Sequence, residues 1–330
     1  MRTELASKLA FLRASNAFDG VVEVIETHMS WVFLTERHAF KLKKPVRLPY
    51  VDYRTIERRR QSCENELRLG RRLALNVYDK VVALVSTASG LAIGGAGEIV
   101  DWLVVMRRLP GDLMLPQMLE RGAATDAHAD ALGDLLGRFY SQALRASWDG
   151  AEYRRRLREL VVAVAGELVE RGASRDTVGR IVRRELSGID GHSRTLDARI
   201  ADGRVVDAHG DLRPEHVCLE TPPVVIDPLE FDDDLRTLDA ASELAFLALE
   251  CDRLGARWFA DRVFASYTAR AGDRVPASLV ELYRGQHALT RAVIALRHLD
   301  DVAPCDQPRW RAKADDYLAR ATPMLEPGRT

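Results

Sequence analysis

Polar side chains follow each of two short apolar runs in the stretch "VVDAHGDLRPEHVCLETPPVVIDPLEF", residues 205–231. The runs 205–206 and 224–226 are β-branched and predict short buried strands with turns between them. The polar residues after them are His209, Asp211, His216 and Asp227. Polar groups beside a core cost free energy unless they are paired or used. An aspartate, a residue of metal-ligand type five positions later and an aspartate at a strand end therefore indicate a chemical site. The alternative is a core histidine and two ordinary turn caps.

The spacing of these residues resembles that of a known catalytic loop. His209-Gly210-Asp211-Leu212 followed by His216 resembles the kinase pattern H-x-D-L-x-x-x-N, and Asp227 resembles the metal-binding aspartate after it. Asp239 lies twelve residues further on, in "LDAA", where small-molecule kinases carry an aspartate at that distance. The "HGDL" form is similar to the aminoglycoside phosphotransferase and choline-kinase-like superfamily rather than to protein kinases.

An upstream strand and helix extend the resemblance. "HAFK" (38–41) resembles the V-A-I-K strand, in which the lysine reaches the α- and β-phosphates of ATP. Glu66 on the following helix is the first choice for the ion-pair partner of Lys41, and Glu64 is the second. Lys41 and Lys43 share a strand face, so either could instead be a solvated edge lysine. Glu66 could equally be a surface partner of a neighbouring arginine.

The resemblance also implies contacts to the rest of the nucleotide. "VVMRRLPGD" looks like the hinge, whose backbone amides around Met106 and Arg108 would hold the adenine edge. The loop 27–30 takes the place of the glycine-rich loop over the phosphates. It lacks glycine, so hydroxyls of Thr27 or Ser30 are expected to contribute.

The family's mechanism can be assigned residue by residue. Asp211 would be the base, flanked by His209 and Arg213 in the catalytic loop, and Asp227 would bind Mg²⁺. His216 takes the place of the metal-binding Asn. Either the second metal site is weak, or Mn²⁺ is favoured, or Glu215 supplies the oxygen.

The resemblance thus implies an ATP-dependent phosphotransferase acting on a hydroxyl of a small molecule. The acidic run "EFDDD" (230–234) could attract a cationic acceptor such as an amino sugar, an aminoglycoside or an amino alcohol, or could be a solvated turn. The rival hypothesis is a nucleotide-binding pseudokinase that serves as a regulatory or interaction module; His216 and the loop without glycine favour it.

Four segments resemble an uncharacterised bacterial branch of this superfamily more narrowly. They are "ETHMSWVFL", "KLKKPV", "HGDLRPEH" and "IDPLEF". Members of that branch often carry a C-terminal P-loop ATPase domain. The chain has no G-x-x-x-x-G-K-[ST], so the phosphotransferase module alone is expected.

Composition narrows the class of protein. A formal net charge of −1 argues against a nucleic-acid binder that neutralises many phosphates. Four scattered cysteines without a Cys-x-x-Cys spacing suit reduced thiols in the cytoplasm. The N-terminus lacks the features of a signal peptide, and no apolar run approaches membrane-spanning length. We therefore expect a cytoplasmic protein whose partner is a small molecule, not nucleic acid or a membrane.

The elements that would position these residues form two lobes. A helix (3–16), five strands (21–26, 31–35, 38–44, 80–86, 98–109) and a helix capped by Asp52 predict a nucleotide-binding lobe, residues 1–108. Pro110-Gly111 marks the boundary, and 109–330 would be a helical lobe with the catalytic loop and the acceptor site. Its expected helices are 126–146, 151–172, 175–188, 238–254, 256–271, 277–299 and 307–321. The fold class is α+β, with the bilobal protein-kinase-like arrangement.

Overall fold

The chain divides into two compact units. The computed structural model describes residues 2–14, 17–18, 20, 22–48, 50–300 and 302–321. Unit 1 comprises Met1–Ala124 and His209–Arg236, and unit 2 comprises Thr125–Ala208 and Thr237–Thr330. This division by compactness groups residues 109–124 and 209–236 with the N-terminal strands. The lobe boundary at residue 108 stays a prediction.

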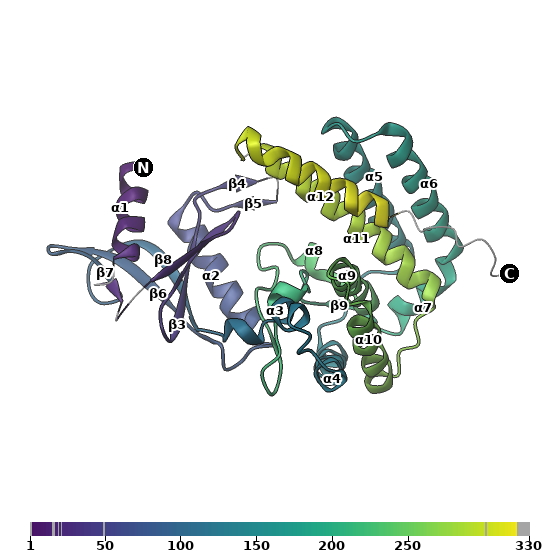
Figure 1. The fold of residues 1–330 in the computed structure, drawn as a ribbon, viewed down its shortest axis with the longest axis horizontal. Coiled ribbons are helices and arrows are strands. Elements are labelled where there is room, and N and C mark those ends of the chain that lie inside the picture. The colour runs from purple at the N-terminus through teal and green to yellow at the C-terminus, as the bar shows by residue number, and fades with distance from the viewer. Residues whose placement is uncertain are drawn as a thin grey trace. The chain divides into compact units, whose positions relative to one another are not determined.

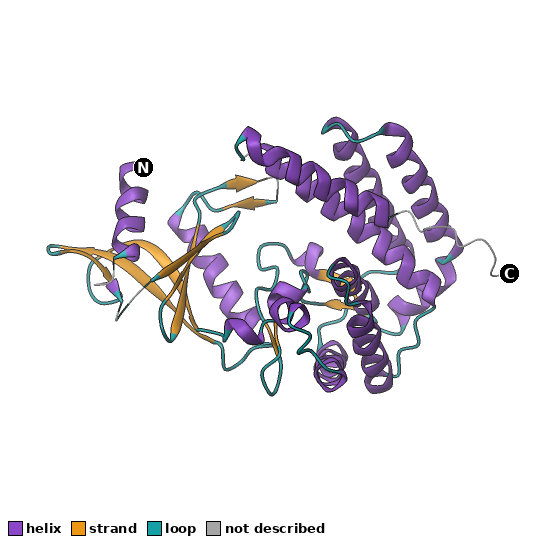
Figure 2. Cartoon of the chain, viewed as in Figure 1, coloured by secondary structure: helices purple, strands orange, loops and turns teal. Residues whose placement is uncertain are grey.

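Unit 1 contains a six-stranded antiparallel sheet in the order β1-β2-β3-β8-β6-β7 (Figure 2). Its strands are β1 (Glu23–Glu26), β2 (Ser30–Leu34), β3 (His38–Lys43), β6 (Tyr78–Thr87), β7 (Gly90–Ile93) and β8 (Glu98–Arg107). The five predicted strands are confirmed. Strand β7 was not among the predicted strands, and it pairs with β6. Val21, the first residue of one predicted strand, lies outside the described residues.

Two helices cover the sheet. Helix α1 (Arg2–Arg13) packs against an apolar cluster that includes Phe33, Leu42 and Leu103. Helix α2 (Ile56–Gly70) packs on β8 and β6 (Figure 1). Strand β3 therefore has neighbours on both faces, which is why its last three residues are all buried rather than alternating. Residues 15–16 of the predicted first helix lie outside the described part of the chain.

The start of α2 differs from the prediction. The N-cap is Thr55, whose hydroxyl accepts a hydrogen bond from the Arg58 amide, and not Asp52. Asp52 instead belongs to β5 (Val51–Asp52), which pairs with β4 (Arg47–Leu48). The side chain of Asp52 accepts bonds from Arg54. The Asp52 carboxylate therefore binds Arg54 and does not cap the helix.

Residues 209–236 complete unit 1 with short elements. They are η3 (Pro214–His216), β10 (Val217–Cys218), β11 (Val224–Val225) and α8 (Asp233–Arg236). β10 pairs with β11. The backbone of Cys218 also forms an isolated antiparallel β-bridge with Met114, which lies between η2 (Gly111–Leu113) and α3 (Leu115–Glu120). The two strands predicted around the catalytic loop therefore exist but belong to different pairs.

Unit 2 is almost wholly helical (Figure 2). Its helices are α4 (Asp126–Gln142), α5 (Gly150–Glu170), α6 (Arg175–Gly191), α7 (Ser193–Ala201), α9 (Ala240–Arg253), α10 (Arg257–Ala271), α11 (Ala277–Arg297) and α12 (Gln307–Arg320), with turns η4 (His298–Asp300) and η5 (Pro304–Asp306). The seven predicted helices are confirmed to within a few residues at each end, and α7 was missed. α4 packs along α10, and α11 packs along α12 (Figure 1). The strand pair β9 (Val205–Asp207) and β12 (Thr237–Asp239) completes the unit.

None of the helices in the described part of the chain is long and apolar enough to cross a membrane.

Candidate active site

Lys41 joins two of the predicted carboxylates. Its ammonium lies 2.8 Å from Glu66 Oε1 and donates a hydrogen bond to Asp227 Oδ1. Strand β3 directs Lys41 toward the buried face of α2, where Glu66 is fully buried. Glu64 is half exposed and pairs with Arg60. Glu66 is therefore the partner of Lys41, and the alternatives of a solvated Lys41 and a surface Glu66 are wrong.

Lys43 makes a second set of ion pairs two residues further along β3. Its ammonium contacts Glu66 Oε2 and Glu230 Oε1, and only 2% of its side chain is exposed. Tyr53 Oη and Ser62 Oγ also donate to Glu230 Oε1, at 2.8 and 3.0 Å. The sequence did not predict this network. The signal that could have indicated it is the two-residue spacing that places both lysines on one strand face.

Charge pairing shifts the acidity of these groups. Burial lowers the pKa of Lys41, but the Asp227 and Glu66 carboxylates more than offset this and hold it above its usual value. Burial likewise raises the pKa of Asp227, and the Lys41 ammonium together with His216 brings it well below the usual range. Lys41 is therefore protonated and Asp227 is ionised around neutral pH.

His209 stabilises the loop through backbone contacts. Its Nδ1 accepts a hydrogen bond from the Asp211 amide at 3.3 Å, so Nε2 carries the proton and donates to Ile226 O at 2.9 Å. Burial lowers its pKa to about 3, so the ring is neutral at physiological pH. Asp239 is paired with Arg199 and Tyr283 inside unit 2.

Asp211 and Asp227 lie on either side of His216. His216 Nδ1 is 3.6 Å from Asp211 Oδ2, and Nε2 is 3.6 Å from Asp227 Oδ2. Arg213 Nε is 3.0 Å from Asp211 Oδ1, and Arg213 Nη2 is 3.1 Å from His216 Nε2. All the residues predicted for the catalytic loop and the metal site are thus brought together within unit 1.

The backbone of Asp227 is strained and supported. Its φ of 61° lies in the left-handed region, which disfavours residues other than glycine. Its amide donates a 2.8 Å hydrogen bond to Tyr78 Oη. A Cβ at Gly70 would lie 2.3 Å from the Tyr78 ring, so a glycine at that position lets the ring reach Asp227. Sequence reasoning missed Tyr78, which 149 positions separate from Asp227.

The loop predicted to cover the phosphates is a tight turn between β1 and β2. Thr27 Oγ1 accepts from the Ser30 amide and donates to Ser30 O, at 3.0 and 3.1 Å. The Ser30 hydroxyl is buried and has no hydrogen-bond partner among the residues that the structure describes. Both hydroxyls therefore face inward or close the turn in this conformation, and their contact with phosphate stays a prediction.

The predicted hinge needs a correction. Met106 lies within β8 opposite Ala39, and its buried side chain packs with Ala39 and Val104. The Arg108 amide donates to Arg37 O at 2.8 Å, which extends the pairing of β8 with β3. This amide is therefore not free to hold an adenine edge, because the β3–β8 pairing continues past the end that the sequence indicated.

The donor chemistry at Asp227 suits a hard cation. Its side chain is 41% exposed, and a carboxylate is a preferred Mg²⁺ ligand. Magnesium is usually held by one or two carboxylates together with substrate phosphates, so one protein carboxylate is compatible with it. His216 supplies a softer nitrogen, and Glu215 is exposed. Within the described residues no group of three or more His, Cys, Asp or Glu side chains forms a metal cage.

The acidic run 230–234 is divided by the fold. Glu230 is buried and bonded to Lys43, so it cannot attract an incoming acceptor. Asp232 Oδ1 accepts from the Leu235 amide, and Asp233, 85% exposed, pairs with Arg236. Phe231 stacks on Tyr50. The attraction of a cation therefore rests on Asp232 to Asp234 alone.

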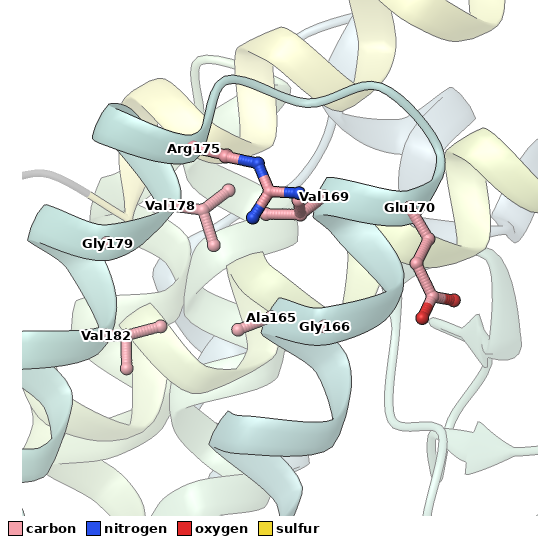
Figure 3. Close-up of a pocket in the computed structure, with 8 residues that line it drawn as sticks. All are labelled: Ala165, Gly166, Val169, Glu170, Arg175, Val178, Gly179 and Val182. Atoms are coloured by element: carbon pink, nitrogen blue, oxygen red, sulfur yellow. The ribbon is translucent and has the colours of Figure 1, made fainter.

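A hollow in unit 2 contains none of the predicted site residues. It lies between α5 and α6, and Figure 3 shows Arg175 reaching across it above apolar side chains that include Val169, Val178 and Val182.

Comparison of the sequence with known protein families decides the family. Residues 35–282 match the model of the phosphotransferase enzyme family. The chain belongs to this family. The predicted resemblance to a phosphotransferase family is thereby confirmed.

Solved structures agree on the fold. A choline/ethanolamine kinase family protein from Mesorhizobium loti superposes with a TM-score of 0.57 at 18% identity, covering 97% of this chain and 94% of that one. Choline kinase LicA from Streptococcus pneumoniae gives 0.52 at 14% identity, covering 96% and 99%. The predicted α+β, protein-kinase-like fold is confirmed.

Uncharacterized proteins of Mycobacterium tuberculosis and Mycobacterium bovis are closer in sequence. They are 31% identical to this chain over 313 residues, which is 92% of the chain and 61% of their own length. The chain therefore spans about three fifths of the length of these relatives.

Proposed function

We propose that the protein transfers the γ-phosphate of Mg²⁺-bound ATP to a hydroxyl of a small molecule. The observation that carries this proposal is the Lys41 ammonium between Glu66 and Asp227, with Asp211 on the adjoining loop. Phosphoryl transfer needs positioning and charge neutralisation more than covalent chemistry, and these groups supply both.

Lys41 and Asp227 would exchange partners when the nucleotide binds. Lys41 would turn from Asp227 to the α- and β-phosphates and keep its contact with Glu66. Asp227 would then be free to hold Mg²⁺, which when bound would neutralise charge on the phosphates. The partial exposure of Asp227 supports this exchange, since a ligand can reach its carboxylate.

Asp211 would act as the base. As the acceptor oxygen forms its bond to the γ-phosphorus, the bond from that phosphorus to the β-phosphate oxygen breaks, and ADP leaves with the electron pair. The acceptor proton passes to the Asp211 carboxylate. Arg213, 3.0 Å away, orients this carboxylate, and neutral His209 holds the loop by its backbone.

The adenine ring would pack against apolar side chains beside Lys41. Ala39 and Met106 are in one cluster with partly buried Ile226 and Met114. Because the Arg108 amide is engaged, adenine would find its backbone partners elsewhere in the segment after β8.

The acceptor is proposed to be cationic: an amino sugar, an aminoglycoside or an amino alcohol. Asp232, Asp233 and Asp234 carry the charge that would attract it. Among proteins of similar fold, one is a choline kinase and another is an aminoglycoside 2'-phosphotransferase.

The test is ATP consumption with Mg²⁺ or Mn²⁺ across sugars, amino sugars, aminoglycosides and amino alcohols. We expect turnover on at least one class. Asp211→Asn should reduce that turnover about a thousandfold or more while binding of a non-hydrolysable ATP analogue persists. A nucleotide-dependent rise in melting temperature without turnover on any acceptor would instead support the pseudokinase.

A further inference from the structure

We propose that Lys43 and Glu230 are positioning residues that keep Glu66 neutralised while Lys41 serves the nucleotide. The inference rests on the proposed function and assigns a role to two residues outside the family motif. It starts from the fact that Glu66 is shared: Oε1 faces Lys41 and Oε2 faces Lys43.

Burial makes this sharing consequential. Glu66 is fully buried, and a buried carboxylate without a cation is strongly unfavourable. If Lys41 were its only counter-ion, Glu66 and the phosphates would have to share that single ammonium whenever the nucleotide binds. Lys43 removes the conflict because its contact with Glu66 does not depend on Lys41.

Lys43 itself is held from the other side. Glu230 contacts its ammonium and also accepts from Tyr53 and Ser62, and Ser62 Oγ lies 2.8 Å from Tyr53 Oη. These partners come from α2, from the segment before it, and from the loop three residues after Asp227. The network therefore joins α2 and the Asp227 loop to β3 without using Lys41.

Accessibility separates the two lysines. The Lys43 side chain is 2% exposed and its partner Glu230 is 7% exposed, whereas Asp227, the partner of Lys41, is 41% exposed. A ligand can therefore compete for Lys41 and Asp227 and has no access to Lys43. The structure thus assigns the accessible pair, Lys41 and Asp227, to nucleotide binding and the enclosed pair, Lys43 and Glu230, to the positioning of Glu66.

The test compares four variants of the whole chain. Lys43→Met together with Glu230→Gln removes both charges of the enclosed pair, which limits the loss of stability. Lys8→Met is the matched control, because Lys8 is also a buried lysine, paired with Asp101 in the same unit. Lys41→Met marks the full loss. The readouts are melting temperature, the dissociation constant of Mg²⁺ with a non-hydrolysable ATP analogue by calorimetry, and the kcat and KM of ATP consumption.

We expect K43M/E230Q to melt no lower than K8M, yet to bind the Mg²⁺-nucleotide about tenfold more weakly and turn over about tenfold more slowly. K8M should keep both values within about twofold of the wild type. Adding Glu66→Gln to K43M/E230Q should raise the nucleotide affinity about threefold or more over that of K43M/E230Q. The reason is that Lys41 is then no longer held by the charge of Glu66 and can serve the phosphates. A purely structural pair would show no such recovery.

Wild-type affinity in K43M/E230Q, or no recovery with Glu66→Gln, would overturn the proposal. The calorimetric readout is independent of the acceptor. A wild-type protein that binds nucleotide but turns over no acceptor would thus refute the transfer reaction, while the affinities still decide the role of Lys43. A wild-type protein that binds no nucleotide would refute both.

Discussion

Each unit buries a network of opposite charges, and the two networks differ in whether they reach solvent. In unit 1, Lys41 and Lys43 share three carboxylates, of which Asp227 is 41% exposed. In unit 2, Arg199 donates to both Asp239 and Asp273, and all three side chains are at most 6% exposed. The hydroxyls of Tyr283 and Tyr267 donate to the same two aspartates, at 2.8 and 2.6 Å.

The difference indicates different uses. The planar guanidinium of Arg199 makes two hydrogen bonds with each carboxylate, so changing partners would break several bonds together. A lysine ammonium is a point charge on a flexible stem and can change partners at lower cost. The open network suits ligand exchange, and the closed one holds α7, β12 and the segment after α10 together.

The largest effect should come from breaking the closed network. Arg199→Met leaves Asp239 and Asp273 buried with only Arg204, 4.0 Å from Asp273, as a nearby cation, and should lower the free energy of unfolding by about 3–5 kcal/mol. Arg262→Met is the control, since its pair with Asp130 is about half exposed and should change stability by less than about 1 kcal/mol. Urea unfolding measures both. Equal midpoints for the two variants would refute the structural assignment.

A buried carboxyl in unit 2 without a hydrogen-bond partner should act next in size. Glu185 on α6 is fully buried, and burial raises its pKa to about 8. A raised folded-state pKa favours the protonated form. The contribution of Glu185 to the free energy of unfolding is therefore fully present below about pH 4.5 and is lost as the pH rises through about 8. Glu185→Gln should therefore stabilise the protein by about 1–4 kcal/mol at pH 8.5 and little at pH 4.5. Thermal melts across pH check this; parallel curves for the two proteins would contradict it.

A moderate effect should follow from the support of Asp227. Tyr78→Phe removes the acceptor of the Asp227 amide and should lower kcat about tenfold, at a stability cost of about 1 kcal/mol. Tyr140→Phe removes a buried hydroxyl that donates to Glu243 in unit 2, so it should cost similar stability without changing kcat. Unchanged kcat in Tyr78→Phe would show that the backbone of Asp227 holds its conformation unaided.

The smallest effect is expected at His216. His216→Asn replaces an imidazole by an amide oxygen, a better Mg²⁺ ligand, and should keep or raise Mg²⁺-dependent turnover, by about threefold at most. Turnover with Mn²⁺ should change less. A complete loss with Mg²⁺ would assign His216 a distinct role.

The sequence predicted the part of the site that follows family spacing. The resemblance to the family's motifs indicated five residues that the structure brings together: Lys41, Glu66, Asp211, His216 and Asp227. The spacing could do this because each residue sits at a defined place on a strand, a helix or a loop whose type the periodicity indicated.

The missed residues depend on contacts between distant segments. Glu230 looked like part of a solvated acidic run, and only the approach of β3 turns it inward to Lys43. Tyr78 and Gly70 are unremarkable within their own elements, and their fit to each other appears only after folding. The prediction that the Arg108 amide holds adenine was wrong because local sequence does not tell how far a strand pairing extends.

The composition of unit 1 from two separated segments has a consequence during synthesis. The first 124 residues supply Lys41, Lys43 and Glu66, but Asp227 and Glu230 come from the second segment. Without that segment two ammoniums would have one carboxylate between them, which opposes dehydration of that face. The charge network can therefore be completed only after translation has passed residue 230, so the growing polypeptide acquires its reactive centre late.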